Sequence, residues 1–60
     1  MNFMTYSVYA NGAELLETED LAQAIRLAKA KADELQTRVT VCENDESNGE
    51  QREIMQVNPK

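Results

Sequence analysis

Residues 18–35 have the sequence TEDLAQAIRLAKAKADEL, and this stretch decides the fold. Its apolar residues recur at spacings of three and four, so they share one side of a helix. These residues are Leu21, Ala24, Ile25, Ala28, Ala32 and Leu35. Thr18 is the expected N-cap, with Glu19 and Asp20 in a first turn where the helix dipole favours negative charge. We therefore predict a helix over residues 19–35 that buries this stripe against a sheet.

Strand signals precede this helix. Residues 3–10 are rich in aromatic and β-branched types, which suit a half-buried strand. The Asn-Gly pair at residues 11–12 follows, and it favours a hairpin because a type I′ turn needs positive φ at both central positions. A second strand over residues 13–17 would run back along the first, with Val8 opposite Leu15. The second segment could equally begin a helix.

Two further strand signals follow the helix. Within residues 38–43, Val39-Thr40-Val41 alternates between apolar and polar types, and residues 52–57 are predicted as the last strand. The polar segment between them, residues 44–49, has a length that favours an antiparallel hairpin. The order predicts an α+β fold, a small ββαββ domain with one helix packed on one face of a four-stranded antiparallel or mixed sheet. Sixty residues make a single domain, residues 1–60.

The composition argues against several kinds of site. The chain has no histidine and a single cysteine, Cys42, so neither a zinc site nor an intrachain disulfide is expected. Residues 44–49 resemble part of a calcium loop, but the position that needs a bidentate Glu is occupied by Met55. Cys42 has no histidine to serve as its base, and no glycine-rich phosphate loop is present. We therefore expect no enzymatic activity, no cofactor and no metal.

The charge balance limits the partners. Eleven Asp and Glu residues against six Lys and Arg residues give a formal charge of −5, which repels phosphate backbones. Direct binding to nucleic acid is therefore not expected. Every apolar run is shorter than the ~20 residues that span a bilayer, so no membrane association is expected. The sequence shows no signal-peptide pattern, and we expect a cytoplasmic protein.

One helix covers only one face of a sheet, so apolar residues of the other parity remain uncovered. Strand alternation, with one residue at the helix edge, defines a candidate protein-contact set. Its members are Phe3, Tyr9, Leu16, Leu27, Cys42 and Ile54. A core of this size is marginal, which favours burial against another protein surface. We predict a protein-binding module that forms a homodimer or docks on a larger, unidentified protein through its open sheet face.

In size, acidity and element order the chain resembles the short orphan proteins of phages and mobile elements, without sharing a motif with them. This resemblance implies an alternative function, the inhibition of a host nuclease or defence complex by nucleic-acid mimicry. The acidic residues that would replace phosphates are Glu14, Glu17, Glu43, Asp45, Glu46 and Glu50. Binding by mimicry should weaken steeply with ionic strength, whereas apolar docking should barely respond.

Overall fold

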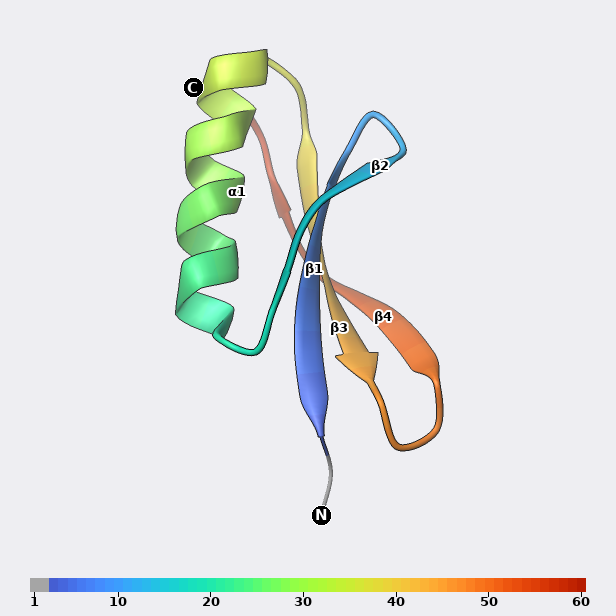
Figure 1. Ribbon diagram of the computed structural model, residues 1–60. Helices are drawn as coiled ribbons and strands as arrows, with labels where there is room; N and C mark the ends of the chain where they lie inside the picture. Colours follow the sequence, from blue (N-terminus) through green and yellow to red (C-terminus); the bar gives the residue numbers. More distant parts are fainter. Residues whose placement is uncertain (1–2) are drawn as a thin grey trace.

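The chain forms a four-stranded sheet with one helix alongside it, as Figure 1 shows. The computed structural model describes residues 3–60. Its elements are β1 (Met4–Ala10), β2 (Ala13–Thr18), α1 (Leu21–Leu35), β3 (Val39–Asp45) and β4 (Glu50–Val57). The strand order is β2-β1-β3-β4, and all three pairings are antiparallel. The ββαββ fold is confirmed, with an antiparallel rather than a mixed sheet.

The first hairpin turns at the Asn-Gly pair. Asn11 and Gly12 have φ values of 53° and 79°, the positive values that a type I′ turn requires. Ala10 pairs with Ala13 on either side of the turn, as expected. The longer β3–β4 loop lies at the opposite end of the sheet, beside the start of β1 in Figure 1.

The helix begins later than the sequence predicted. Asp20 is the N-cap, and its Oδ1 accepts the backbone N–H groups of Ala22 and Gln23 at 3.0 and 3.3 Å. The prediction of Thr18 as the N-cap is wrong because Thr18 still belongs to β2, where it pairs with Tyr6. The Thr18 hydroxyl instead accepts the backbone N–H of Asp20 at 3.1 Å. The carboxylate that was expected in the first turn therefore forms the cap itself.

The core lies between α1 and the sheet and consists only of small residues. Its buried members are Val8, Ala10, Ala24, Ala28, Ala32, Val39 and Val41. The alanines allow the helix backbone to approach the strands closely, which leaves the longer side chains at the margins. Leu21 and Leu35 are exposed at the two ends of the helix, Ile25 is half-buried, and Leu27 packs against the core. The buried stripe is therefore centred on the alanines and includes Leu27, whereas Leu21 and Leu35 of the predicted stripe are exposed.

A β-bulge changes the register of the first hairpin. The pairing shifts between Val8 and Tyr9, so Val8 faces Leu16 and Tyr9 faces Glu14. Leu15 is the extra residue, and its side chain is 37% exposed. The expected pairing of Val8 with Leu15 is wrong because one inserted residue moves the rest of β2 to the other parity. Leu16 consequently packs against the core rather than lying on the open face.

The second hairpin contains a matching bulge. The β3–β4 pairing shifts between Val41 and Cys42, and Ile54 is the extra residue. Glu-Ile-Met at residues 53–55 thus corresponds to Glu-Leu-Leu at residues 14–16, each placed beside the middle of a central strand. Exchanging β1 with β3 and β2 with β4 relates the two hairpins. This relation is the internal pseudo-symmetry of the fold.

Candidate functional site

The face of the sheet opposite α1 has a polar floor. Ser7 and Thr5 of β1 are only 1% and 7% exposed, although no helix covers them. Asn44 of β3 donates from Nδ2 to Ser7 Oγ at 2.8 Å and to Thr5 Oγ1 at 3.1 Å. Among residues 3–60, every buried side-chain nitrogen and oxygen has a hydrogen-bond partner. Hydrogen bonding therefore compensates for the burial of these polar groups.

Longer side chains extend this network toward the edges of the sheet. Gln51 of β4 donates from Nε2 to Asn44 Oδ1 at 2.8 Å and to the Tyr9 hydroxyl oxygen at 3.2 Å. The network thus joins β1, β3 and β4 across the open face. Asn44 is bonded through both its amide nitrogen and its amide oxygen, which fixes the orientation of its side chain.

Two carboxylates meet at Thr5. Its Oγ1 lies 3.2 Å from Glu17 Oε2 and 3.0 Å from Glu46 Oε1. The hydroxyl has a single proton, so it donates to one carboxylate at a time. A carboxylate of β2 and a carboxylate of the β3–β4 loop thus share one donor on β1.

Acidic side chains surround a hollow of about 360 Å³ above this floor. Its carboxylates come from β2, the end of β3, the following loop and the start of β4. They are Glu14, Glu17, Asp45, Glu46 and Glu50. Within the described part of the chain, no Lys or Arg lines this hollow. We call these five residues the acidic rim, and five of the six carboxylates in the predicted acidic surface belong to it.

The sixth predicted carboxylate has a different place. Glu43 Oε1 forms an ion pair with Arg52 at 2.8 Å, so its charge is already balanced by a neighbour. It is not among the residues around the hollow. The structure therefore separates Glu43 from the other members of the predicted acidic surface.

Hydrogen bonds favour the charged form of one carboxylate of the acidic rim. Asp45 Oδ1 accepts hydrogen bonds from the hydroxyl and the backbone N–H of Ser47, and these bonds lower the pKa of the Asp45 carboxyl. The backbone N–H of Asn48 contributes a further lowering. Hydrogen bonds of this kind favour the ionised form because they donate to the negative charge.

The predicted protein-contact residues are dispersed. Tyr9 faces the hollow, as expected for the open face. Leu16 and Leu27 are half-buried and pack against the core, so Leu16 does not lie on the open face as predicted. A contact role for either residue stays a prediction. Phe3 lies exposed at the start of β1, and Ile54 lies exposed at the bulge in β4. These side chains do not form one apolar surface.

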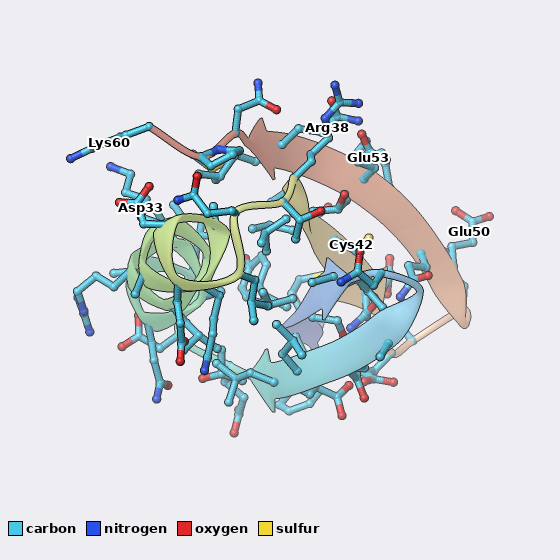
Figure 2. The ribbon with its side chains drawn as sticks, turned by 90° about the horizontal axis from the view of Figure 1, so that it is seen from above. Asp33, Arg38, Cys42, Glu50, Glu53 and Lys60 are labelled. Atoms are coloured by element: carbon cyan, nitrogen blue, oxygen red, sulfur yellow. The ribbon has the colours of Figure 1, made fainter. Side chains whose placement is uncertain are left out.

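Cys42 lies opposite Ser7, on the side of the sheet away from the helix (Figure 2). It is only 8% exposed, so it offers little area to a partner. Burial, with a smaller contribution from the negative charge of Glu53, raises the pKa of the Cys42 thiol. A raised pKa keeps the sulfur protonated at neutral pH, which makes it a weak nucleophile.

Reasoning from the sequence missed the floor of the site. Thr5 and Ser7 lie in the predicted first strand, whereas Asn44 falls in the predicted turn over residues 44–49 and Gln51 falls outside every predicted element. The available signal was a period-two row of hydroxyl residues in β1, which indicates a polar sheet face. The amide partners on β3 and β4 become visible only once the strand register is known.

No family model, curated protein or solved structure matches this chain. Within residues 3–60, no group of three or more His, Cys, Asp or Glu side chains is arranged to hold a metal ion. The helix in the same range is too short and too polar to cross a membrane. The candidate site therefore has to be interpreted from its own geometry.

Proposed function

We propose that this chain is a non-enzymatic protein-binding module that docks through its open sheet face on a basic surface of a larger protein. The observation that carries the proposal is the convergence of five carboxylates around one hollow that no Lys or Arg among residues 3–60 lines. Complementary charge steers encounter and selects partners. The free, buried Cys42 is compatible with the reducing cytoplasm, which we propose as its location.

The negative charge of this face also disfavours certain partners. Two copies brought together through their acidic rims would place like charges opposite one another, which is unfavourable. A homodimer formed through this face is therefore disfavoured, although the small core had favoured self-association. Nucleic acid is rejected for the same reason. A partner with exposed Lys and Arg residues gains from every carboxylate of the rim.

Mimicry of nucleic acid is a more specific form of the same proposal. A mimic needs negative charges at defined positions, and the carboxylates of Glu17 and Glu46 both lie within hydrogen-bond distance of the Thr5 hydroxyl. Asp45 is fixed by Ser47. These contacts favour the phosphate-binding groove of a nuclease or defence complex as the basic surface. The chain would then act as an inhibitor.

A pair of charge-matched variants tests the docking proposal. Glu14→Gln with Glu50→Gln removes two charges from the acidic rim, at side chains that make no hydrogen bond within residues 3–60. Glu34→Gln with Glu53→Gln removes the same net charge from residues that do not line the hollow. Both proteins and the unsubstituted chain are used to capture proteins from the native host, with quantitative mass spectrometry as the readout.

We expect the unsubstituted chain and the Glu34/Glu53 variant to capture the same basic protein in equal amounts. Loss of two exposed charge pairs should weaken its binding to the Glu14/Glu50 variant by about tenfold at low ionic strength. Raising the salt concentration should weaken binding of the unsubstituted chain in the same direction. Equal retention of every captured protein by the two variants would contradict docking through the acidic rim. Displacement of the chain by a DNA duplex would distinguish a mimic from other acidic ligands.

A further inference from the structure

The chain contains two Asn-Gly pairs, and the structure places them in different environments. One is Asn11-Gly12 at the tip of the first hairpin, and the other is Asn48-Gly49 in the β3–β4 loop. Both asparagines and both glycines are exposed. A Cβ atom added at either glycine would meet nothing within 4 Å. Exposure and sequence therefore do not distinguish the two pairs, whereas their hydrogen bonds do.

The second pair is tied into its loop. The Gly49 N–H donates to the Asp45 carbonyl at 2.8 Å, and the Asn48 N–H donates to the same oxygen at 3.3 Å. Asn48 Oδ1 accepts the backbone N–H of Glu50 at 2.9 Å. Both the side-chain amide of Asn48 and the backbone nitrogen that follows it are thus engaged. Neighbouring carboxylates of the acidic rim also oppose the removal of a proton from that nitrogen.

The first pair lacks these restraints. Within residues 3–60, the Gly12 N–H donates to no backbone carbonyl and to no side chain. Asn11 Oδ1 accepts only the Thr37 hydroxyl, at the long distance of 3.5 Å. The side-chain amide and the following nitrogen are therefore free to approach one another at the tip of the hairpin, where short-lived opening costs little.

From this contrast we propose that Asn11 is a site of spontaneous deamidation in the folded protein, and that the β3–β4 loop protects Asn48. The inference does not depend on the proposed docking function. The Gly12 nitrogen loses its proton and attacks Asn11 Cγ, forming the N–Cγ bond of a succinimide. The Cγ–Nδ2 bond breaks, and the leaving group departs with a proton as ammonia. Water then opens either carbonyl of the ring, giving an aspartyl or an isoaspartyl residue without any oxidation or reduction.

The isoaspartyl product would change the hairpin. It routes the main chain through Cβ and Cγ and so adds one carbon to a two-residue turn whose geometry sets the pairing of β1 with β2. It also replaces an amide with a carboxylate, which changes the formal charge from −5 to −6. The modified chain should therefore be separable from the parent by charge as well as by stability.

Peptide mapping tests this proposal directly. The purified chain is incubated at mildly alkaline pH, and samples are digested with trypsin at intervals. Cleavage after Arg and Lys places Asn11 in the peptide 1–26 and Asn48 in the peptide 39–52. Fragmentation then locates each aspartyl or isoaspartyl residue. We expect conversion of Asn11 to be about tenfold faster, because two hydrogen bonds must break first at Asn48.

The same chain in concentrated urea provides the control. Without the fold, the two Asn-Gly pairs should convert at nearly equal rates, so the ratio should fall toward one. Equal rates in the native protein would overturn the proposal, as would faster conversion of Asn48. A preference for Asn11 that persisted unchanged in urea would show that the local sequence, rather than the structure, selects the site, and would overturn it as well.

Discussion

The two faces of the sheet bury their residues by different means. Val8 and Ser7 are neighbours in β1, and they are 0% and 1% exposed on opposite faces. Val8 is covered by the alanines of α1, whereas Ser7 lies beneath polar side chains that are hydrogen-bonded to one another. Loss of access to water on the open face therefore does not require an apolar cover. A polar layer that satisfies its own hydrogen bonds has the same effect.

The two faces of the sheet also contribute to the free energy of folding in different ways. The helix-covered face gains from apolar burial and is sensitive to changes in side-chain volume. The open face gains little net free energy from each hydrogen bond, but it suffers when a buried partner is left unsatisfied. Substitutions on the two faces should consequently differ in size and in how they combine.

The largest effect is expected at a position of α1 that is fully buried against the sheet. Ala28→Leu inserts three carbon atoms at a fully buried position, so it should lower the free energy of unfolding by about 3 kcal/mol. Urea denaturation measures the change. Ala30→Leu makes the same substitution on the exposed side of α1 and should cost less than about 0.5 kcal/mol. Similar losses in the two variants would show that the helix does not pack through its alanines.

Adjacent leucines in β2 test the bulge. Leu16 packs against the core, so Leu16→Ala should cost about 2 kcal/mol of unfolding free energy. Leu15 is the exposed extra residue, and Leu15→Ala should cost less than about 1 kcal/mol. The same denaturation experiment compares them. A larger loss of stability for Leu15→Ala than for Leu16→Ala would instead indicate a register without the bulge, with Val8 opposite Leu15.

A smaller effect is expected on the open face. Ser7→Ala removes one of the two hydroxyl acceptors of Asn44 Nδ2 and should cost about 1 kcal/mol. A double-mutant cycle with Asn44→Ala measures the coupling between the two side chains. We expect the double variant to lose less than the sum of the single variants. Strict additivity would mean that this hydrogen bond contributes nothing to stability.

The smallest effect concerns a single titration. Ser47→Ala removes the hydroxyl that helps to lower the pKa of the Asp45 carboxyl, so that pKa should rise toward its ordinary value. A carboxyl whose pKa is lowered by folding stabilises the native state above its unfolded pKa, and this contribution is lost as the pH falls through its folded pKa. NMR titration of Asp45 measures the shift. Ser7→Ala, which leaves the Ser47 contacts intact, should not change this pKa.

Local patterns were enough to predict the order of elements. The alanine-rich helix, the Asn-Gly turn and the strands over residues 3–10 and 38–43 were all predicted from neighbouring residues, and the structure confirms them. The bulges were missed because the predicted strands were assumed to alternate without interruption. Their signal was two consecutive apolar residues in each edge strand, Leu15-Leu16 and Ile54-Met55, which break the alternation.

The candidate site was only partly predictable. The acidic residues were recognised as a set, but they are spread between residues 14 and 50, and no local spacing brings them together. Their convergence depends on the long-range pairing of β1 with β3. The N-cap was misplaced for a related reason, since the pairing of Thr18 with Tyr6 extends β2 past the best local capping residue.

The bulges in β2 and β4 have a consequence for aggregation. The outer strands β2 and β4 are the two free edges of the sheet, where unpaired backbone groups could recruit a strand from another copy and begin a growing fibril. The extra residues Leu15 and Ile54 interrupt each edge near its middle, and the local increase in twist turns it away from a flat neighbour. An incoming strand would find only short stretches of regular ladder on either side. We therefore expect the same irregularity that disturbs the alternation of the sequence to oppose edge-to-edge stacking of the chain.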